Sequence, residues 1–190
     1  MNFIDLDLDQ RKEQRMNELL KMMLCRRSIR QYTEEHVSEE HLQSILQAGL
    51  LSASGRRLRP WELIVVRDRT MLKRLSECRE GAAKMLAGAD CAILVLGDRE
   101  KSDTIIEDCS IVMANMHLMA SSLGLGSCWI QGRLRNAPDC RTTEDYVREL
   151  LHFPERYQLE AILSIGVPAK AAPAYDLASL PYERVHYDQF

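Results

Sequence analysis

Three arginines and a serine lie within the short segment RRSIR at positions 26–30. If this segment is extended, Arg26, Ser28 and Arg30 project from the same side, because side chains alternate along an extended backbone. Arginine stays charged at working pH and its planar fork matches phosphate oxygens, to which a serine hydroxyl adds a further donor. The segment could therefore hold a dianionic phosphate monoester. The alternative is a solvated basic turn, which is the commoner explanation for a charge run taken alone.

A second group of candidates lies in the segment SASGRRLRPWELIVV at positions 52–66. Its small residues from Ser52 to Gly55 would let a flat ligand approach the backbone closely. The arginines that follow could donate hydrogen bonds to carbonyl oxygens of such a ligand. The alternative is a helix C-terminus followed by a loop, with Trp61 filling the core, and for Trp61 we prefer this structural interpretation.

The third segment, GLGSCWIQGRLR at positions 124–135, contains a predicted buried strand and turns at Gly132. Backbone N–H groups at such a turn could donate to a ring nitrogen, which requires geometry rather than a particular side chain. Taken alone, this segment is a weak indication of a ligand site.

The order of these three segments resembles the FMN-dependent nitroreductase family, from about Leu24 to the end of the chain. The likeness is closest to a compact branch with an RPWE loop, a GDxEKSD turn (here at 97–103), a GLGSCWI strand and a terminal Y-E-x-V-H-Y arm. The resemblance implies an α+β fold, a nitroreductase-like sandwich in which helices flank a mixed, largely antiparallel central sheet. It also implies a homodimer formed through long helices, with exchanged C-terminal arms (here residues 172–190) and one FMN in each of two clefts between the subunits.

The same resemblance assigns roles in cofactor binding. Arg26, Arg27 and Ser28 would hold the ribityl phosphate, and Arg30 would reach the pyrimidine edge of the flavin. Arg30, assisted by Arg57, would stabilise the negative charge that reduction places on the N1–C2=O edge, as preorganised donors do. The other cofactor residues form two sets, one from the partner subunit and one that presents backbone groups toward flavin N5 and O4. The first set is Ser54, Gly55 and Arg57 of the partner subunit, and the second is Gln131 and Gly132. Ile130, next to them, is a further expected cofactor-binding residue.

Two features depart from the commoner family pattern. Arg57 and Arg59 stand where many members have Asn and Gln. The basic pair near the tail that completes the phosphate site in many members has Lys170 as its only candidate. The resemblance therefore supports FMN binding more strongly than it describes the substrate pocket.

The resemblance implies hydride transfer from NADH or NADPH to a small oxidised acceptor, such as a nitroaromatic or a quinone, with ping-pong kinetics. The flavin carries this chemistry, so we expect no acid–base pair and no metal in the protein. Gly124 and Gly126 close a helix and open a strand, the reverse of a dinucleotide-binding fingerprint, so the nicotinamide would bind transiently. Rival interpretations are a flavin carrier, a flavin-remodelling or dehalogenating enzyme of the same fold, and a non-enzymatic interaction module that uses the arginine clusters.

Composition narrows the functional class. The 190 residues fit one domain, with 1–10 as a lead-in, and 46% hydrophobic and 28% charged residues are typical of a globular protein. A net charge of −3 argues against general nucleic-acid binding. Six scattered cysteines and a charged N-terminal stretch predict reduced thiols and a cytoplasmic location. No window reaches the roughly 18 apolar residues of a membrane span, so we expect no membrane insertion.

Hydrophobic periodicity predicts the elements that would position these segments. Strands are expected over 62–66, 91–96, 127–131 and 159–166, and helices over 10–25, 38–50, 69–78, 103–123 and 143–152, with the second of these helices capped by Ser38. Helix 103–123 is apolar nearly all round, so a second subunit would cover part of it, and His117 would be a satisfied interface histidine without a catalytic role. In the tail, alternation at Val185 and Tyr187 fits either a strand that pairs with something or a frayed terminus lying on its own subunit.

Overall fold

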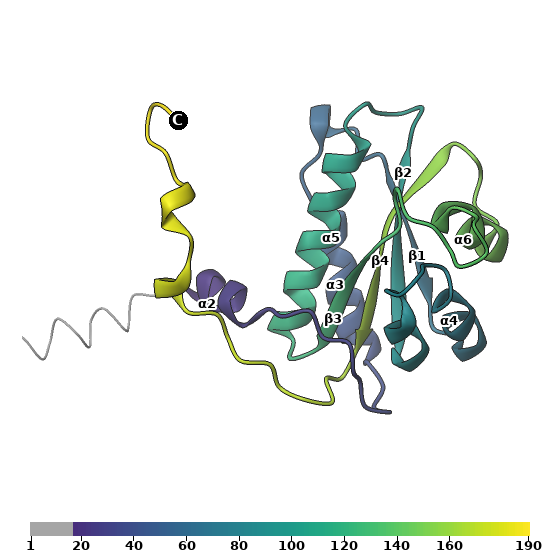
Figure 1. The fold of residues 1–190 in the computed structure, drawn as a ribbon, viewed down its shortest axis with the longest axis horizontal. Helices are drawn as coiled ribbons and strands as arrows, with labels where there is room; N and C mark the ends of the chain where they lie inside the picture. The colour runs from purple at the N-terminus through teal and green to yellow at the C-terminus, as the bar shows by residue number, and fades with distance from the viewer. Residues whose placement is uncertain (1–16) are drawn as a thin grey trace, which may run out of the picture.

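Four strands form the centre of the fold, in the order β1-β2-β4-β3 (Figure 1). This computed structural model describes residues 17–190. The strands are β1 (Trp61–Val66), β2 (Cys91–Asp98), β3 (Gly126–Gln131) and β4 (Tyr157–Gly166). The expected α+β class is confirmed, and the strands match their predicted positions closely.

The sheet differs from the expectation in one respect, because each strand pair among residues 17–190 is antiparallel and the sheet is not mixed. A parallel contact does occur, as an isolated bridge between Ser28 and Ser127. After this bridge the segment that contains Ser28 moves away from β3, and Tyr32 forms an antiparallel bridge with Pro168, just beyond β4. The segment that contains the first arginine cluster therefore crosses from β3 to the end of β4 without extending the sheet.

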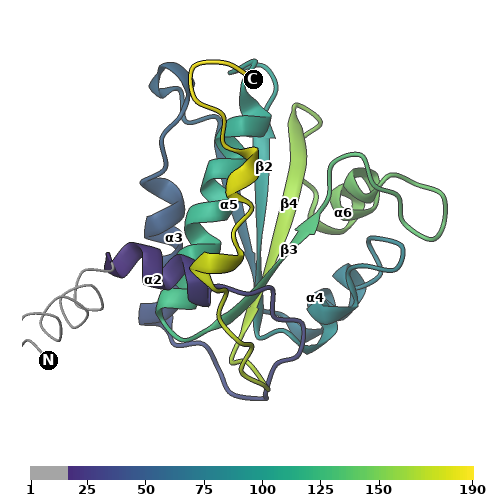
Figure 2. The same cartoon turned by 60° about the vertical axis from the view of Figure 1, so that its left-hand side comes forward.

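Helices cover both faces of the sheet (Figures 1 and 2). On one face lie α3 (Glu39–Leu50) and α5 (Ile105–Ser122), and on the other lie α4 (Arg69–Leu75) and α6 (Thr143–Leu151). Two buried apolar clusters fill these faces, one containing Met113 and Met116 and the other containing Leu94 and Ile162. Because β2 and β4 are covered on both sides, β2 reads as an apolar run, and β4 does so with few polar interruptions, among them Glu160. Within residues 17–190, no helix is both long and apolar enough to cross a bilayer.

Several helix ends follow the signals expected from the sequence. The Ser38 hydroxyl accepts a hydrogen bond from the N–H of His41 at 3.1 Å, so Ser38 caps α3 as predicted. At the C-terminus of α5, Gly124 takes a left-handed φ of 74°. The N–H of Leu125 then reaches back to the carbonyl of Ala120 at 2.9 Å, which is the Schellman pattern.

Two predicted helices have different bounds in the structure. The helix predicted over 69–78 ends at Leu75, where the Ser76 hydroxyl donates to the carbonyl of Lys73 at 2.7 Å and competes with the helical backbone. The helix predicted over 10–25 is described from its cap Asn17 onward, as α2 (Glu18–Cys25). Its earlier part lies outside the described residues.

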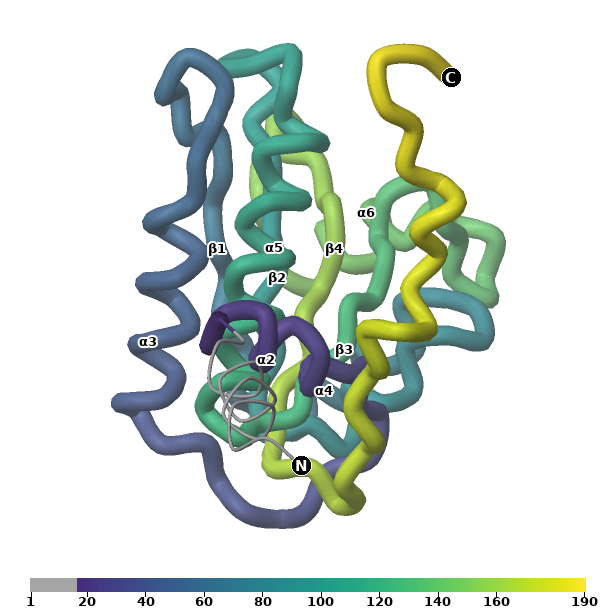
Figure 3. Tube along the Cα trace, turned by 90° about the vertical axis from the view of Figure 1, so that its left-hand side faces the viewer, coloured from purple at the N-terminus to yellow at the C-terminus, as the bar shows by residue number. Residues whose placement is uncertain are grey.

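The C-terminal segment is not a strand in this chain. It contains the 3₁₀ turns Leu177–Ser179 and Tyr182–Arg184 and runs past α2 and away from the sheet (Figures 1 and 3). Near its base the N–H of Tyr175 donates to the carbonyl of Leu24 at 2.9 Å. Farther out Tyr187 is 84% exposed. The segment therefore neither pairs with a strand among residues 17–190 nor packs along its own domain, and the exchange of arms between subunits stays a prediction.

Candidate functional site

Arg26 lies where α2 ends and the extended segment toward β3 begins. It is the C-cap residue of α2, and its backbone N–H still bonds the carbonyl of Met22. Its Nη1 lies 2.8 Å from Nε2 of His117 on α5. The other ring nitrogen of His117, Nδ1, lies 2.5 Å from the hydroxyl of Ser127 in β3. Two helices and an edge strand therefore meet at the guanidinium of Arg26.

Arg30 lies near the same part of β3 as Arg26. Both guanidinium groups are close enough to Cys128 in β3 to act on its thiol: burial raises the pKa of Cys128, and the positive charges of Arg30 and Arg26 oppose that rise. Arg30 is exposed and donates from Nη1 to the carbonyl of Ser28 at 3.3 Å, and Ser28 is also exposed. The structure thus brings Arg26, Ser28 and Arg30 together beside β3, as the alternation of an extended chain predicts.

Arg27 is directed elsewhere. Its guanidinium donates to the carbonyl of Pro173 and lies over the ring of Tyr175, 4.4 Å from the ring centroid. With Lys170 it lines a separate cavity of about 190 Å³ near the base of the tail. The physical reason is again alternation, since the residue between two that share one side of an extended chain faces the other side. The resemblance groups Arg27 with Arg26 and Ser28, whereas the structure places it with Lys170.

Backbone N–H groups of β3 can meet a flat ring only along its outer edge, because β4 pairs with the other edge. The N–H of Gly132 is already committed, because it donates to the carbonyl of Glu160 in β4 at 3.0 Å. Backbone groups alternate in direction along an antiparallel strand, so Ile130 also faces β4 while Gln131 faces outward. In agreement, the Gln131 carbonyl accepts a hydrogen bond from Arg79 at 3.4 Å. Of Gln131 and Gly132, both expected to present N–H groups, only Gln131 has the required orientation.

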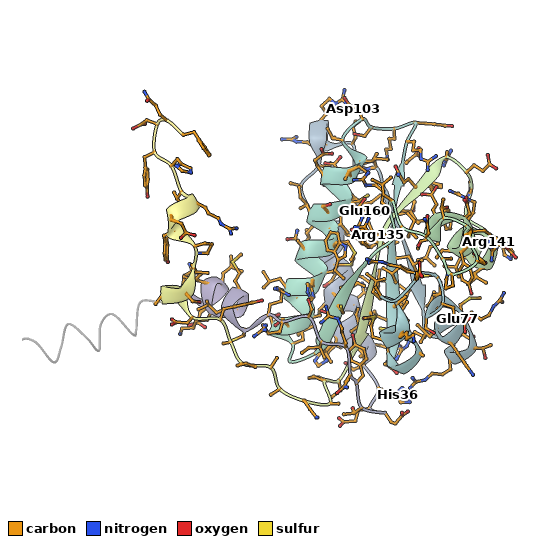
Figure 4. The ribbon with its side chains drawn as sticks, in the orientation of Figure 1. His36, Glu77, Asp103, Arg135, Arg141 and Glu160 are labelled. Carbon is orange, nitrogen blue, oxygen red and sulfur yellow. The ribbon has the colours of Figure 1, made fainter. Side chains whose placement is uncertain are left out.

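A cavity of about 510 Å³ lies beside this end of β3. The indole Nε1 of Trp129 donates to Oε1 of Gln131 at 2.8 Å, and Nε2 of Gln131 donates to Oε1 of Glu160 at 3.2 Å. Burial raises the pKa of Glu160, and the opposing effects of Gln131 and Arg133 do not cancel that rise. Glu160 and Arg135, which both line the cavity, are labelled in Figure 4. The cavity therefore combines guanidinium groups with an aromatic edge and one buried carboxyl; its other lining residues are Arg79, Ile106, Ser110 and Leu134.

The loop between α3 and β1 is held against the start of α5. The N–H of Gly55 donates to Oδ1 of Asp108 at 2.8 Å. A Cβ at Gly55 would lie 2.6 Å from the Thr104 hydroxyl oxygen, so glycine permits this close approach. The Ser54 hydroxyl accepts a hydrogen bond from the N–H of Arg59 at 2.9 Å. The donor of Gly55 and the hydroxyl of Ser54 are thus engaged in shaping their own loop.

Three arginines of this loop adopt left-handed backbone angles. Arg56, Arg57 and Arg59 have φ values of 52°, 59° and 46°. Such angles in residues other than glycine cost on the order of 1 kcal/mol or more each, and they persist where the surrounding structure imposes them. Arg57 is exposed within this loop. Trp61, just beyond it, is 7% exposed and belongs to the apolar core, as we expected.

One chain does not bring this loop onto the edge of β3. Gly55 bonds Asp108, whereas Arg26 bonds His117 about nine residues later on α5, which corresponds to roughly 13 Å along the helix axis. Asp108 also faces a different side of α5 from Ser110, which lines the cavity beside β3. The residues expected from a partner subunit therefore lie far from the phosphate candidates of the same chain.

A comparison with protein families explains why these features occur together. The sequence matches the family described as "Nitroreductase family" over residues 24–78 and 69–167. The chain belongs to the nitroreductase family. The resemblance drawn from the three sequence segments is thereby confirmed.

Relatives of this nitroreductase-family chain match it over most of its length. A protein of Archaeoglobus fulgidus, provisionally named NADH dehydrogenase/NAD(P)H nitroreductase, is 38% identical over 165 residues, which cover 85% of this chain and 91% of the relative. The structure of an FMN-dependent nitroreductase from Clostridium difficile R20291 has a TM-score of 0.88 and 43% identity, covering 90% of this chain and 99% of its own. A provisionally named nitroreductase from Desulfovibrio desulfuricans, crystallised in complex with FMN, has a TM-score of 0.74 and 28% identity, covering 92% and 99%.

Sequence reasoning misses the contacts that three polar residues make in this nitroreductase-family site: His117, Ser127 and Glu160. His117 is expected as a satisfied interface histidine; the chain itself supplies the partners of both ring nitrogens, Arg26 and Ser127, and the interface stays a prediction. The contact between Arg26 and His117 joins residues 91 positions apart, so no local sequence pattern predicts it. Glu160 does leave a signal, because it is an acidic residue within the otherwise apolar run LEAILSIG.

Proposed function

We propose that this chain binds FMN beside β3 and passes hydride from NADH or NADPH to a small oxidised acceptor, such as a nitroaromatic or a quinone. The observation that carries the proposal is the convergence of Arg26, Ser28 and Arg30 at the edge of β3. Two solved relatives support it, one named as FMN-dependent and the other crystallised with FMN.

The side chains at this place fit a phosphorylated flavin. An arginine has several N–H donors, and the contact of Arg26 with His117 occupies one of its nitrogens. The remaining donors of Arg26 and the exposed hydroxyl of Ser28 can meet phosphate oxygens, and Arg30, farther along the segment, is left for the ring. A dianionic phosphate would therefore gain charge-assisted hydrogen bonds here, which are stronger than bonds between neutral groups.

Bound FMN would supply the hydride chemistry, and the residues of the chain would orient the ring and polarise it. The outward N–H of Gln131 is held in place by the strand, so it can donate to the ring without reorganising. Arg30 would stabilise negative charge at the pyrimidine edge. The cavity beside Gln131 gives the nicotinamide and the acceptor a place to bind in turn, as ping-pong kinetics requires.

We further propose that the working unit is a homodimer, in which Ser54, Gly55 and Arg57 of the partner subunit complete the site. The distance between this loop and Arg26 within one chain supports a second copy. Exposed apolar side chains on and next to α2 and α3 also support it, since Leu19 and Met23 are 50% exposed and Leu51 is 84% exposed. Sedimentation equilibrium should give twice the chain mass of 21.8 kDa, and a stable monomer would contradict the dimer.

Absorbance and anaerobic reduction test the catalytic proposal. Protein loaded with FMN and freed of excess should be yellow, should bleach with NADH or NADPH, and should regain its colour when a nitroaromatic or a quinone is added. A yellow protein inert to both nicotinamides would favour a flavin carrier. A protein that cannot retain FMN would reject the proposal and favour an interaction module.

A further inference from the structure

We propose that His117 and Ser127 are positioning residues that hold the Arg26 guanidinium ready for a flavin phosphate, and that they thereby set the preference of this site for FMN over riboflavin. The inference rests on the proposed FMN site. It concerns affinity for the phosphate and not the hydride chemistry.

The directions of the hydrogen bonds in this group follow from the donors present. Arginine has donors and no acceptor, so Nε2 of His117 must accept the bond from Arg26, at 2.8 Å. A ring nitrogen that accepts carries no proton, so the proton of the neutral imidazole is on Nδ1. Nδ1–H then donates to the hydroxyl of Ser127, at 2.5 Å. Arg26 therefore donates to His117 and His117 donates to Ser127, so each hydrogen bond pairs one donor with one acceptor.

Two members of this group, His117 and Ser127, are buried. His117 is 7% exposed and Ser127 is 2% exposed. Burial, together with the charge of Arg26, lowers the pKa of His117 to about 4, so the imidazole keeps its Nε2 lone pair at neutral pH.

Ser127 also fixes the backbone beside the phosphate candidates. Its carbonyl accepts a hydrogen bond from the N–H of Ile29 at 2.9 Å, next to the bridge that it forms with Ser28. In Figure 2 the segment after α2 runs past the C-terminal end of α5 toward β3, where these contacts form. One residue of β3 thus anchors both the ring that holds Arg26 and the chain that carries Ser28.

An arginine that is held in advance binds its ligand more tightly, because it has already lost most of its rotamer freedom. Loss of the His117 contact should therefore weaken FMN binding roughly three- to tenfold. Riboflavin shares the ring and the ribityl chain of FMN but lacks the phosphate, so its affinity should not depend on the contact. A merely structural role for His117 would weaken the binding of both flavins alike.

Fluorescence titrations of the full chain with FMN and with riboflavin test the inference. His117→Leu removes the acceptor, so the Kd for FMN should rise roughly three- to tenfold while the Kd for riboflavin stays unchanged. His117→Gln is the matched control, because its amide can accept from Arg26 and donate to Ser127, and it should bind FMN as the wild type does. Ser127→Ala removes the outer contact and should weaken FMN binding in the same direction by a smaller factor.

A double-mutant cycle with Arg26→Ala isolates the coupling between the two side chains. In the Arg26→Ala background, His117→Leu should have no further effect on FMN binding. Equal weakening of both flavins by His117→Leu, or no weakening of FMN, overturns the positioning role and leaves the proposed function intact. Wild-type protein that binds neither flavin overturns the proposed function and this inference with it. If His117→Leu does not fold, Ser127→Ala decides, and unchanged FMN affinity in that variant overturns the inference.

Discussion

His117 should make a measurable contribution to the pH dependence of stability. Its pKa is about 4 in the folded chain, whereas an unperturbed histidine titrates near 6.5. Between these pH values the unfolded chain binds a proton on this ring and the folded chain does not, so the free energy of unfolding falls as the pH falls. For these two pKa values the loss is about 1.4 kcal/mol near pH 5.5 and about 2.5 kcal/mol near pH 4.5.

Urea unfolding of the flavin-free protein at one protein concentration measures this loss. His117→Gln removes the titrating ring and leaves the other titrating groups in place, so they cancel when the two proteins are compared. Between near pH 7.5 and near pH 4.5, the wild type should therefore lose about 2.5 kcal/mol more free energy of unfolding than the variant does. Parallel pH profiles would refute the reasoning, because they would mean that His117 titrates alike in the folded and unfolded chains.

Three further predictions concern the loop, the thiols and the flavin site. Gly55→Ala should lower the free energy of unfolding by about 1–3 kcal/mol in chemical denaturation, because the new Cβ would lie 2.6 Å from the Thr104 hydroxyl oxygen. Cys25 and Cys140 are exposed and the other four cysteines are buried, so a thiol reagent should modify at most two groups in the native protein and six after unfolding; a third fast-reacting thiol in the native protein would contradict the structure. Arg30→Ala should retain much of its FMN but be reduced by the nicotinamide on the order of a hundredfold more slowly in stopped-flow, and an unchanged rate would remove Arg30 from the mechanism.

The elements could be predicted because their determinants are local. Ser38 caps a helix through a residue three positions away, and Gly124 ends α5 through its own backbone angle. The apolar run of β2 reflects cover on both faces of the sheet, which a sequence records directly. The conformation of the tail could not be predicted. Alternation at Val185 and Tyr187 is compatible with a strand, but it does not say whether the edge of another strand is available for pairing.

The site could be predicted in part, because some of its contacts are local and others join distant segments. Alternation along 26–30 correctly places Arg26 and Arg30 together, and the same alternation turns Arg27 away. The engagement of the Gly132 N–H depends on the register between β3 and β4, which no single segment encodes. The contact of His117 with Arg26 depends on how α2 lies against α5, and that packing is a property of the whole fold.

A crystal structure of the protein with bound FMN tests the central claim most directly. The account predicts that the phosphate lies within hydrogen-bond distance of Arg26 and Ser28, with Arg30 at the pyrimidine edge and the ring beside Gln131. A phosphate seated in the cavity of Arg27 and Lys170, or a flavin bound away from β3, would contradict it.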